Sequence, residues 1–449
     1  MTRGGGKLKE RDPLFELVLK WITVPEWDMT MTLREAILKC ENLIDQHLEL
    51  RGAAGSGIPR AKSSNGTAEH NGNGGAKPAH QSGTSSELEA GCPGIGGFFT
   101  RLPLIKALNT LSAKNPVEQR RYVPPTLSEI RQVFNMAQVY ELPGRVRMLT
   151  FDADDTLYEH GMDLQREDWI VTALLTLMEQ GIYVAVVTAA GYPGKPLRYE
   201  SRFKGLLELM VERKTSKEVA SMFYCMGGEC NYLFRLTHPE EGVYKMEGVP
   251  EEEWATPEIL SWKETDIARL LDIAEGALKE ACTTMRLQVQ FVRKPRAVGA
   301  FPTRAEDRIA YEVLEDIALR VQDHVENHAD GKVNIPFCAF NGNRDVWVDV
   351  GDKRIGIEAL QQYIGISSVN TCHIGDRFTS TGNDLRSRDV AMTVWVTDPK
   401  ETEDYLELLL RGMGKPECVE CAEERPVGPK QGTIEWEKAQ VVQRNTAGT

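Results

Sequence analysis

Two aspartates separated by a single residue are the side chains of this sequence best suited to chemistry. In Arg147-Met-Leu-Thr-Phe-Asp-Ala-Asp-Asp-Thr-Leu-Tyr158, an apolar run that favours a β-strand ends at Asp152, and Asp154 follows. Residues two apart on a strand point to the same side, and α/β proteins bind ligands at the carboxyl ends of parallel strands. The two carboxylates could therefore face one phosphate with a metal ion between them. An ordinary strand followed by an acidic turn would show the same residues.

Three further polar residues stand at the ends or starts of elements later in the sequence. Thr188 ends the apolar run 182–188, and Asp376 ends the run 371–376. Lys353 falls in the first turn of a helix that we expect after a strand at 345–350. If these strands are parallel neighbours, their ends meet at one edge of the sheet. On local grounds alone, Thr188 could equally be a helix cap.

The chemistry that fits this set is attack on a phosphate ester. Such an ester repels nucleophiles, so a divalent cation and Lys353 would neutralise its charge. Asp152 could attack phosphorus and form an aspartyl-phosphate, while Asp154 could protonate the leaving oxygen and later activate water. Mg²⁺ prefers oxygen ligands, which suits Asp152, the Asp154 carbonyl and Asp376. Thr188 would donate a hydrogen bond to a phosphoryl oxygen.

Composition is that of a globular protein and argues against two kinds of partner. The 449 residues are enough for two or three domains, with 41% hydrophobic and 27% charged residues. A net charge of −13 argues against nucleic acid or an anionic membrane as the main partner. No apolar run is long enough to span a bilayer. Without a secretory signal or a cysteine framework, we expect a cytoplasmic protein with reduced thiols.

Hydrophobic periodicity indicates the elements that position these groups. We expect an α/β fold with a Rossmann-like parallel core sheet, and a helical N-terminal region in which Thr126 and Glu129 have capping-box spacing. The strands that we predict are 146–151, 182–188, 221–225, 287–293, 337–341, 345–350, 371–376 and 390–396. The helices that we predict include 168–180, 204–213, 258–284 and 305–324.

The spacing of the motifs places the part of the chain that would select a substrate. About 30 residues separate Thr156 from Thr188, whereas about 165 separate Thr188 from Lys353. A large α+β cap must therefore be inserted between the second and third motifs. The division that we predict is a helical N-terminal region 1–50, a low-complexity disordered insert 51–97, a helical regulatory or assembly region 98–145, core 146–200, cap 201–336, core 337–411 and a tail 412–449.

The order of the motifs resembles the haloacid-dehalogenase-like phosphohydrolase superfamily. That superfamily has two Asp on its first strand, Ser or Thr on the second, Lys or Arg before the last site strand, and an acidic Gly-Asp…Asp loop. A cap between the second and third motifs looks like the branch that contains sugar-phosphate phosphatases and phosphomannomutases. The stretch GDRFTSTGND at 375–384 supports this resemblance.

Within that branch the sequence is similar to the inosine-monophosphate-specific 5′-nucleotidase family of fungi and some protists. The similarity covers roughly residues 98–410 and the helical N-terminus. It implies Mg²⁺-dependent hydrolysis of IMP to inosine and phosphate, allosteric activation by ATP, and a homotetramer. The residues that carry it are RYVPP at 121–125, TFDADDTLYEHG at 150–161, VVTAAGY at 186–192, NGNRDVWVDVGDKRIGI at 341–357 and HIGDRFTSTGND at 373–384.

The resemblance also implies substrate contacts. Asp345 and Trp347 lie in the family's substrate-contacting stretch, which suggests Asp345 at the ribose or base edge and Trp347 near the purine. On an alternating strand Trp347 could instead be a core residue. Arg198 and Arg202, after the second motif, could reach substrate from the cap hinge or lie on a solvated face.

The resemblance also assigns phosphate, metal and effector roles. Thr188 and Lys353 would hold phosphate, and Asn383 and Asp384 would support the metal through its waters. Arg131 is the candidate for the triphosphate of the effector, and a surface or subunit-interface role is the alternative.

Two other functions fit the same motifs. One is a sugar-phosphate phosphatase or phosphomutase-like enzyme on the same scaffold. The other is an inactive nucleotide-sensing scaffold, against which the intact pair Asp152 and Asp154 argues.

Overall fold

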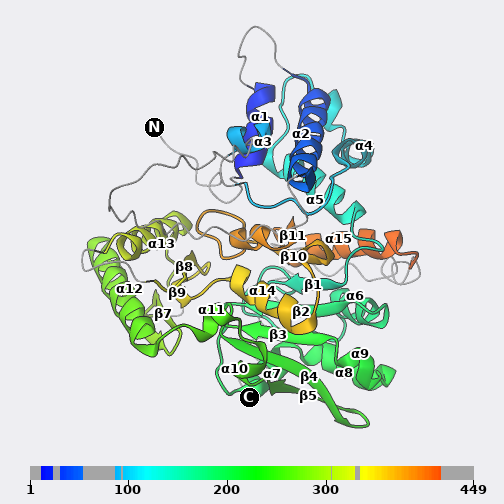
Figure 1. The fold of residues 1–449 in the computed structure, drawn as a ribbon. Coiled ribbons are helices and arrows are strands. Elements are labelled where there is room, and N and C mark those ends of the chain that lie inside the picture. The colour runs from blue at the N-terminus through cyan, green and yellow to red at the C-terminus, as the bar shows by residue number, and fades with distance from the viewer. Residues whose placement is uncertain are drawn as a thin grey trace, which may run out of the picture.

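The computed structural model describes residues 12–23, 31–53, 86–92, 95–304, 306–328 and 334–415. The predictions for the first eleven residues, for most of the insert and for nearly all of the tail lie outside these ranges. A helical unit formed by α1–α5 stands above the core sheet in Figure 1, and a smaller unit with its own sheet and helices α12 and α13 stands beside the core.

The core is a seven-stranded sheet in the order β11-β10-β1-β2-β3-β4-β5. The pairings from β11 to β3 are parallel, whereas β4 and β5 are antiparallel. Strand β1 therefore lies in the middle of the parallel part, between β10 and β2. The strands are β1 Met148–Phe151, β2 Tyr183–Thr188, β3 Phe223–Gly227, β4 Tyr232–Glu240, β5 Val243–Gly248, β10 Thr371–Gly375 and β11 Met392–Trp395.

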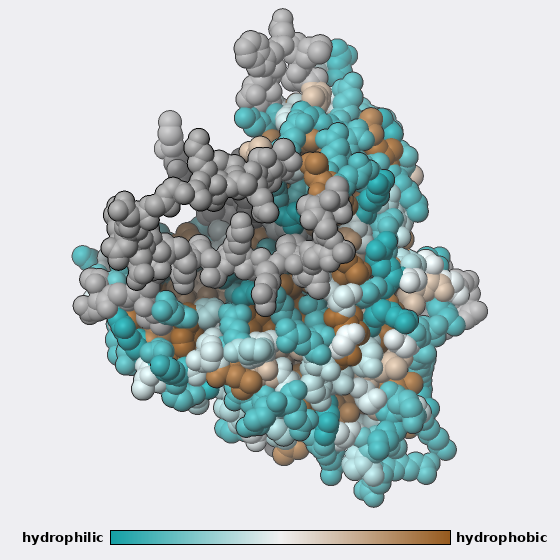
Figure 2. Space-filling model, in the orientation of Figure 1, coloured by the Kyte–Doolittle hydropathy of each residue, from teal (hydrophilic) through white to brown (hydrophobic). Residues whose placement is uncertain are grey.

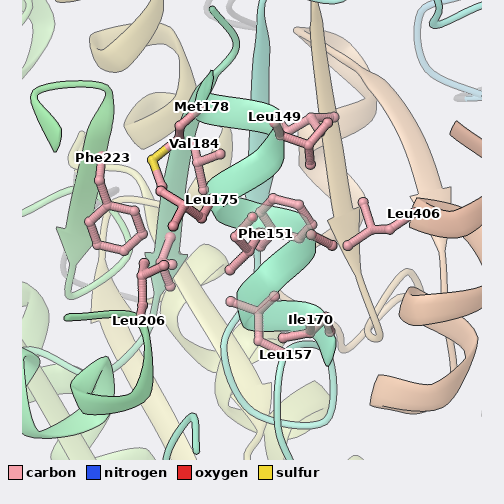
Figure 3. Packing of buried hydrophobic residues seen from close by; sticks show 14 of the residues in the cluster. Leu149, Phe151, Leu157, Ile170, Leu175, Met178, Val184, Leu206, Phe223 and Leu406 are labelled. Carbon is pink, nitrogen blue, oxygen red and sulfur yellow. The ribbon is translucent and has the colours of Figure 1, made fainter. Parts of the chain in front are cut away.

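Apolar side chains on both faces hold the parallel strands in place. Figure 3 shows Leu149 and Phe151 of β1 against α6, with Leu406 of α15 nearby. Met148 points to the other face, where it packs in the cluster of α14. Such double burial is typical of parallel strands. The helices around this sheet are α6 Trp169–Glu179, α7 Pro196–Arg202, α8 Lys204–Arg213, α9 Lys217–Ala220, α10 Glu251–Trp254, α11 Pro257–Leu260, α14 Lys353–Ile364 and α15 Pro399–Gly412.

The cap unit contains a four-stranded antiparallel sheet in the order β6-β7-β9-β8. Buried residues of α12 and α13 pack against this sheet in one hydrophobic cluster. The helix expected at 258–284 is divided into α11 and α12, and α13 begins later than expected. The elements are α12 Glu264–Thr284, α13 Tyr311–Glu326, β6 Val289–Lys294, β7 Ala297–Pro302, β8 Phe337–Asn341 and β9 Val346–Val350.

The strand pairings differ from the expected boundaries between core and cap. Strands β3, β4 and β5 lie in the stretch 201–336 that we assigned to the cap, but they extend the core sheet. Strands β8 and β9 lie in the stretch 337–411 that we assigned to the core, but they belong to the cap sheet. The reason is that pairing partners are set by contacts distant in sequence, which periodicity does not reveal.

The N-terminal helices pack together around an apolar cluster that also contains Phe378 and Trp395 of the core. The predicted capping box of Thr126 and Glu129 is present at the start of α5. Helix α3 lies within the stretch 51–97, which we expected to be disordered; Ser86 caps it and Leu88 is buried. The helices are α1 Pro13–Thr23, α2 Leu33–Ala53, α3 Glu87–Gly91, α4 Leu104–Lys114 and α5 Leu127–Tyr140.

The described surface is largely polar. In Figure 2 hydrophilic residues dominate the visible face, and hydrophobic ones are scattered among them. None of the helices in the described ranges combines the length and the apolar character that crossing a bilayer requires.

Candidate active site

A buried lysine and three aspartates meet at the carboxyl end of the core sheet. Lys353 Nζ lies 2.7 Å from Asp152 Oδ1 and 2.6 Å from Asp384 Oδ1. Carboxylate oxygens of Asp152, Asp376 and Asp384 all lie within 4.8 Å of one another. All four side chains are buried. The structure thus brings Asp152, Lys353 and Asp376 together, as expected from the sequence.

The backbone explains why these residues converge. Strands β1 and β10 are parallel with Phe151 opposite Ile374, and the N–H of Asp152 donates to the carbonyl of Ile374 at 2.9 Å. Asp152 and Asp376 therefore leave neighbouring strands at nearly the same level. Lys353 begins α14, whose N-cap Asp352 accepts a hydrogen bond from the N–H of Ile355 at 3.0 Å.

Asp384 is held by donors on several sides. Besides Lys353, its carboxylate contacts His373 Nε2 at 2.9 Å and accepts the N–H of Arg377 at 2.8 Å. His373 Nδ1 lies 2.9 Å from the Thr150 hydroxyl, so the imidazole packs beneath the loop. A Cβ at Gly375 would lie 2.5 Å from this carboxyl group, so Asp384 can come this close to β10 only where the strand carries glycine.

The electrostatics keep the lysine and its partner charged. Burial alone would raise the pKa of Asp384, but the Lys353 ammonium and the His373 imidazole outweigh it and lower this pKa. Burial alone would lower the pKa of Lys353, but Asp152 and Asp384 raise it. Burial, opposed by Lys353, raises the pKa of Asp152.

The carboxylate of Asp376 is buried with few groups to compensate its negative charge. Burial raises its pKa well above the ordinary value. Neither carboxylate oxygen has a hydrogen-bond partner among the described residues, and Arg377 Nε lies 3.5 Å away. Oxygen donors in a buried site with excess negative charge fit a hard divalent cation. Asp152 and Asp376 therefore meet the requirements for a Mg²⁺ site.

Asp154 points towards the turn that follows β1. Its carboxylate accepts the N–H of Gly161 at 2.8 Å, and His160 Nδ1 lies 3.9 Å away. The side chain is about one-third exposed and is not part of the metal-capable group. It can therefore exchange protons with solvent or with a leaving group. Arg202 supports the same turn, because Nη1 donates to the Met162 carbonyl at 2.6 Å.

Thr188 ends the strand that neighbours β1. It is 5% exposed, and its hydroxyl oxygen accepts the N–H of Ala190 at 3.1 Å. Its position beside the end of β1 places the hydroxyl on the same edge as Asp152.

The cap contributes an aromatic and a cation. Lys294 Nζ lies 4.4 Å from the ring centroid of Trp347 and 6.0 Å from that of Tyr192, which follows β2 in the core. Trp347 is half-buried rather than a core residue, and its ring lies across Gly299 of the adjacent strand. Asp345 is also half-buried, and burial raises its pKa. Trp347 lies in β9 and Lys294 in β6 of the cap sheet, and Asp345 directly precedes β9.

Two arginines that we expected to bind substrate or effector do not join the carboxylate group. Arg198 is exposed on α7. Arg131 is 1% exposed, with Nη1 donating to the Trp395 carbonyl at 2.5 Å and to Glu401 at 2.8 Å. The expectation that Arg131 is available to a triphosphate disagrees with this position. The reason is that α5 packs this face against β11 and α15.

The sequence analysis missed a buried acid next to Thr188. Glu229 lies in the turn after β3, and its N–H donates to the Thr188 carbonyl at 2.9 Å. Its carboxylate accepts a hydrogen bond from Asn383 Nδ2 at 2.8 Å, so Asn383 is tied to this turn. Burial raises the pKa of Glu229 well above its ordinary value. The sequence gives only a weak indication of this role. Glu229 is a polar residue shortly after β3, the strand that pairs with the Thr188 strand.

Comparison with known proteins agrees with this geometry. The "IMP-specific 5′-nucleotidase 1" of Neurospora crassa is 40% identical, with 74% of this chain and 79% of that protein aligned. The structure of truncated, IMP-bound Plasmodium falciparum IMP-nucleotidase has a TM-score of 0.73 at 28% identity, covering 91% of this chain and 99% of that chain. The ATP-bound structure of that nucleotidase has a TM-score of 0.68 at 30% identity, covering 89% and 86%. The family model of IMP-specific 5′-nucleotidases matches residues 28–406. By this match the chain belongs to the IMP-specific 5′-nucleotidases, a family of phosphoric monoester hydrolases.

Proposed function

We propose that this protein removes the 5′-phosphate of IMP to give inosine and phosphate. The observation that carries the proposal is the buried group of Asp152, Lys353 and Asp376, in a chain whose relatives are named for this reaction. A Plasmodium falciparum relative has been solved with IMP bound.

In the proposed mechanism Asp152 is the nucleophile. Its carboxylate oxygen forms a bond to phosphorus while the bond from phosphorus to the 5′-oxygen breaks. Asp154 donates a proton to that oxygen, which leaves as inosine. Asp154 then takes a proton from water, which attacks the aspartyl-phosphate and releases phosphate with Asp152 restored. The exposure of Asp154 beside the turn at His160 suits this exchange of protons.

The remaining site residues bind and orient. Asp152, the Asp154 carbonyl and Asp376 would hold Mg²⁺, which supplies positive charge to the phosphoryl oxygens. Lys353 and Thr188 hold the phosphate. Asp384 keeps Lys353 charged and fixed in place.

The cap residues are proposed to bind the nucleoside. Trp347 offers a half-buried ring for the purine, and Asp345 offers a carboxylate for the ribose or the base edge. Arg202 supports the turn that carries His160. Arg198, which is exposed on α7, is proposed to contact the substrate at the rim of the site. Asn383 is proposed to support the site indirectly, because its side-chain amide donates a hydrogen bond to Glu229.

Regulation by ATP and assembly as a homotetramer are proposed from the family. A Plasmodium falciparum relative has been solved with ATP. We assign no effector role to Arg131, because its guanidinium is buried and paired with Glu401.

The test is phosphate release from a panel of mononucleotides and hexose phosphates, with and without Mg²⁺ and ATP. We expect release from IMP, dependence on Mg²⁺ and stimulation by ATP. Asp152→Asn should lower kcat by at least about a thousandfold, because the nucleophile is lost, while the circular dichroism spectrum stays unchanged. Turnover of hexose phosphates without IMP would favour the sugar-phosphate alternative, and an active D152N enzyme would refute the nucleophile.

A further inference from the structure

The backbone carbonyl of Asp376 accepts a hydrogen bond from a buried indole. Trp395, the last residue of β11, donates its Nε1–H to the Asp376 carbonyl at 2.9 Å. The indole is 2% exposed, so water does not compete for this bond. Among the described residues the carboxylate oxygens of Asp376 have no hydrogen-bond partner, and Arg377 Nε lies 3.5 Å away, so the position of this side chain depends largely on its backbone.

The indole is in turn held by the N-terminal helices. Asn135 of α5 receives the N–H of Trp395 at 3.0 Å on its amide oxygen and donates Nδ2 to the Trp395 carbonyl at 2.5 Å. The Asn135 amide therefore satisfies the N–H and the carbonyl of Trp395 on the open edge of β11, as a neighbouring strand would. Phe15 of α1 stacks on the indole, with ring centroids 6.0 Å apart and an interplanar angle of 18°.

A second contact joins the same unit to the loop beyond Asp376. Phe378 lies 6.1 Å from Trp395 between ring centroids and belongs to the apolar cluster of the N-terminal helices. Arg388 stacks over Phe378 at 5.1 Å and pairs with Asp12, which caps the start of α1. The N-terminal unit thus contacts the loop at Phe378 as well as the strand end at Trp395.

We propose that Trp395 and Asn135 are positioning residues for Asp376, and that the N-terminal helical unit thereby sets the affinity of the active site for its divalent cation. This inference rests on the proposed function, because it assumes that Asp376 is a cation ligand. Neither side chain touches substrate; they act through the backbone of Asp376.

The experiment compares two tryptophan variants of the full chain. W395F removes the N–H donor and keeps an aromatic ring for Phe15. W254F is the matched control, because the buried Trp254 donates a comparable bond to the Val249 carbonyl, in a cluster that Asp376 does not join. Binding of Mg²⁺ without substrate is measured by calorimetry, and kcat and KM for IMP are measured across Mg²⁺ concentrations.

We expect W395F to weaken Mg²⁺ binding about five- to tenfold, which corresponds to the loss of one hydrogen bond. At saturating Mg²⁺ its KM for IMP should remain within about twofold of wild type, because a positioning role leaves the substrate contacts intact. W254F should bind Mg²⁺ like wild type. Equal Mg²⁺ affinity of W395F and wild type would overturn the inference.

A second variant keeps the test decisive if W395F does not fold. F15L retains every hydrogen bond of Trp395 and loses the ring contacts of Phe15 with Trp395 and Phe134, so a smaller weakening in the same direction is expected. Unchanged Mg²⁺ affinity in F15L would then overturn the inference. If the wild-type protein itself neither binds Mg²⁺ nor needs it, the proposed function fails instead, and this result does not depend on either variant.

Discussion

At the scale of single residues, the buried ion pair between Lys353 and Asp384 organises the site. Removing one partner of a buried pair leaves an uncompensated charge, whereas the intact pair has its donors and acceptors satisfied. Asp384 contacts Lys353 and His373 and accepts the N–H of Arg377, so its loss affects several groups together. This explains why a residue without a role in bond making is embedded so deeply.

Asp384→Asn is expected to destabilise the fold by about 3 kcal/mol, the usual cost of breaking a buried pair. Its kcat/KM for IMP should fall at least about tenfold, because Lys353 loses the partner that fixes it. The measurements are urea unfolding and initial rates. Glu208→Gln is the control, since Glu208 and Lys204 form an exposed pair on α8 and such pairs contribute little. A loss below about 1 kcal/mol in D384N would contradict the assigned role.

The buried carboxyl group of Asp349 makes the stability of the fold depend on pH. Burial raises its pKa from 3.8 to about 7 in the folded protein. Between these values the folded state keeps a proton that the unfolded chain releases, so stability falls as pH rises and levels off above the folded pKa.

Asp349→Asn should therefore be more stable than wild type near neutral pH. The difference in unfolding free energy should grow by on the order of 1 kcal/mol per pH unit above about pH 4, and it should vanish below that. Denaturant unfolding across pH measures it. Asp266→Asn, exposed on α12, is the control and should show a flat difference. A flat difference for D349N would show that Asp349 is ionised in the folded state.

At the scale of elements, a helix of the cap is bonded to the acidic loop of the core. Glu315 of α13 is buried; it accepts Nδ2 of Asn341 at 2.9 Å and the hydroxyl of Thr381. Arg377, in the same loop as Thr381, donates to the Asn341 carbonyl at 2.5 Å. Cap and loop therefore move together or lose buried hydrogen bonds.

Thr381→Val removes the hydroxyl with little change of shape and leaves the Glu315 carboxylate short of a donor. We expect a loss of about 1–3 kcal/mol in stability and a higher KM for IMP, because the cap is held less firmly over the site. Thr371→Val is a matched control on β10, where a buried hydroxyl bonds the Ser367 carbonyl away from the cap. If both variants keep the wild-type KM, the link does not hold the cap.

The elements also show what the sequence can and cannot predict. Asp152, Thr188 and Asp376 could be found because each stands at the carboxyl end of a strand that is continuous in the sequence. The pairing of Lys353 with Asp384, the turn that carries Glu229 and the hydrogen bond from Trp395 to Asp376 could not, because they depend on contacts between distant segments. Arg131 shows the same limit, since an arginine on a helix gives no sign in sequence of the strand that buries it.

At the scale of the whole molecule, the site lies between units that have their own apolar cores. One cluster fills the N-terminal helices and another the cap, while two more cover the faces of the core sheet. The cap contacts the acidic loop of the core through Glu315, and the N-terminal unit contacts Trp395 of the core through Asn135. We therefore propose that substrate selection and cation affinity depend on different units, which the variants T381V and W395F test separately.

The pairing of β1 with β10 has a consequence for biosynthesis. His373 meets Thr150 across 223 positions of sequence, and β10 inserts directly beside the strand that bears Asp152. A nascent chain on the ribosome therefore exposes the unpaired edge of β1 until β10, more than 200 residues later, has been translated. Any polypeptide released before that point would carry an open strand edge prone to aggregation and would have no hydrolytic activity.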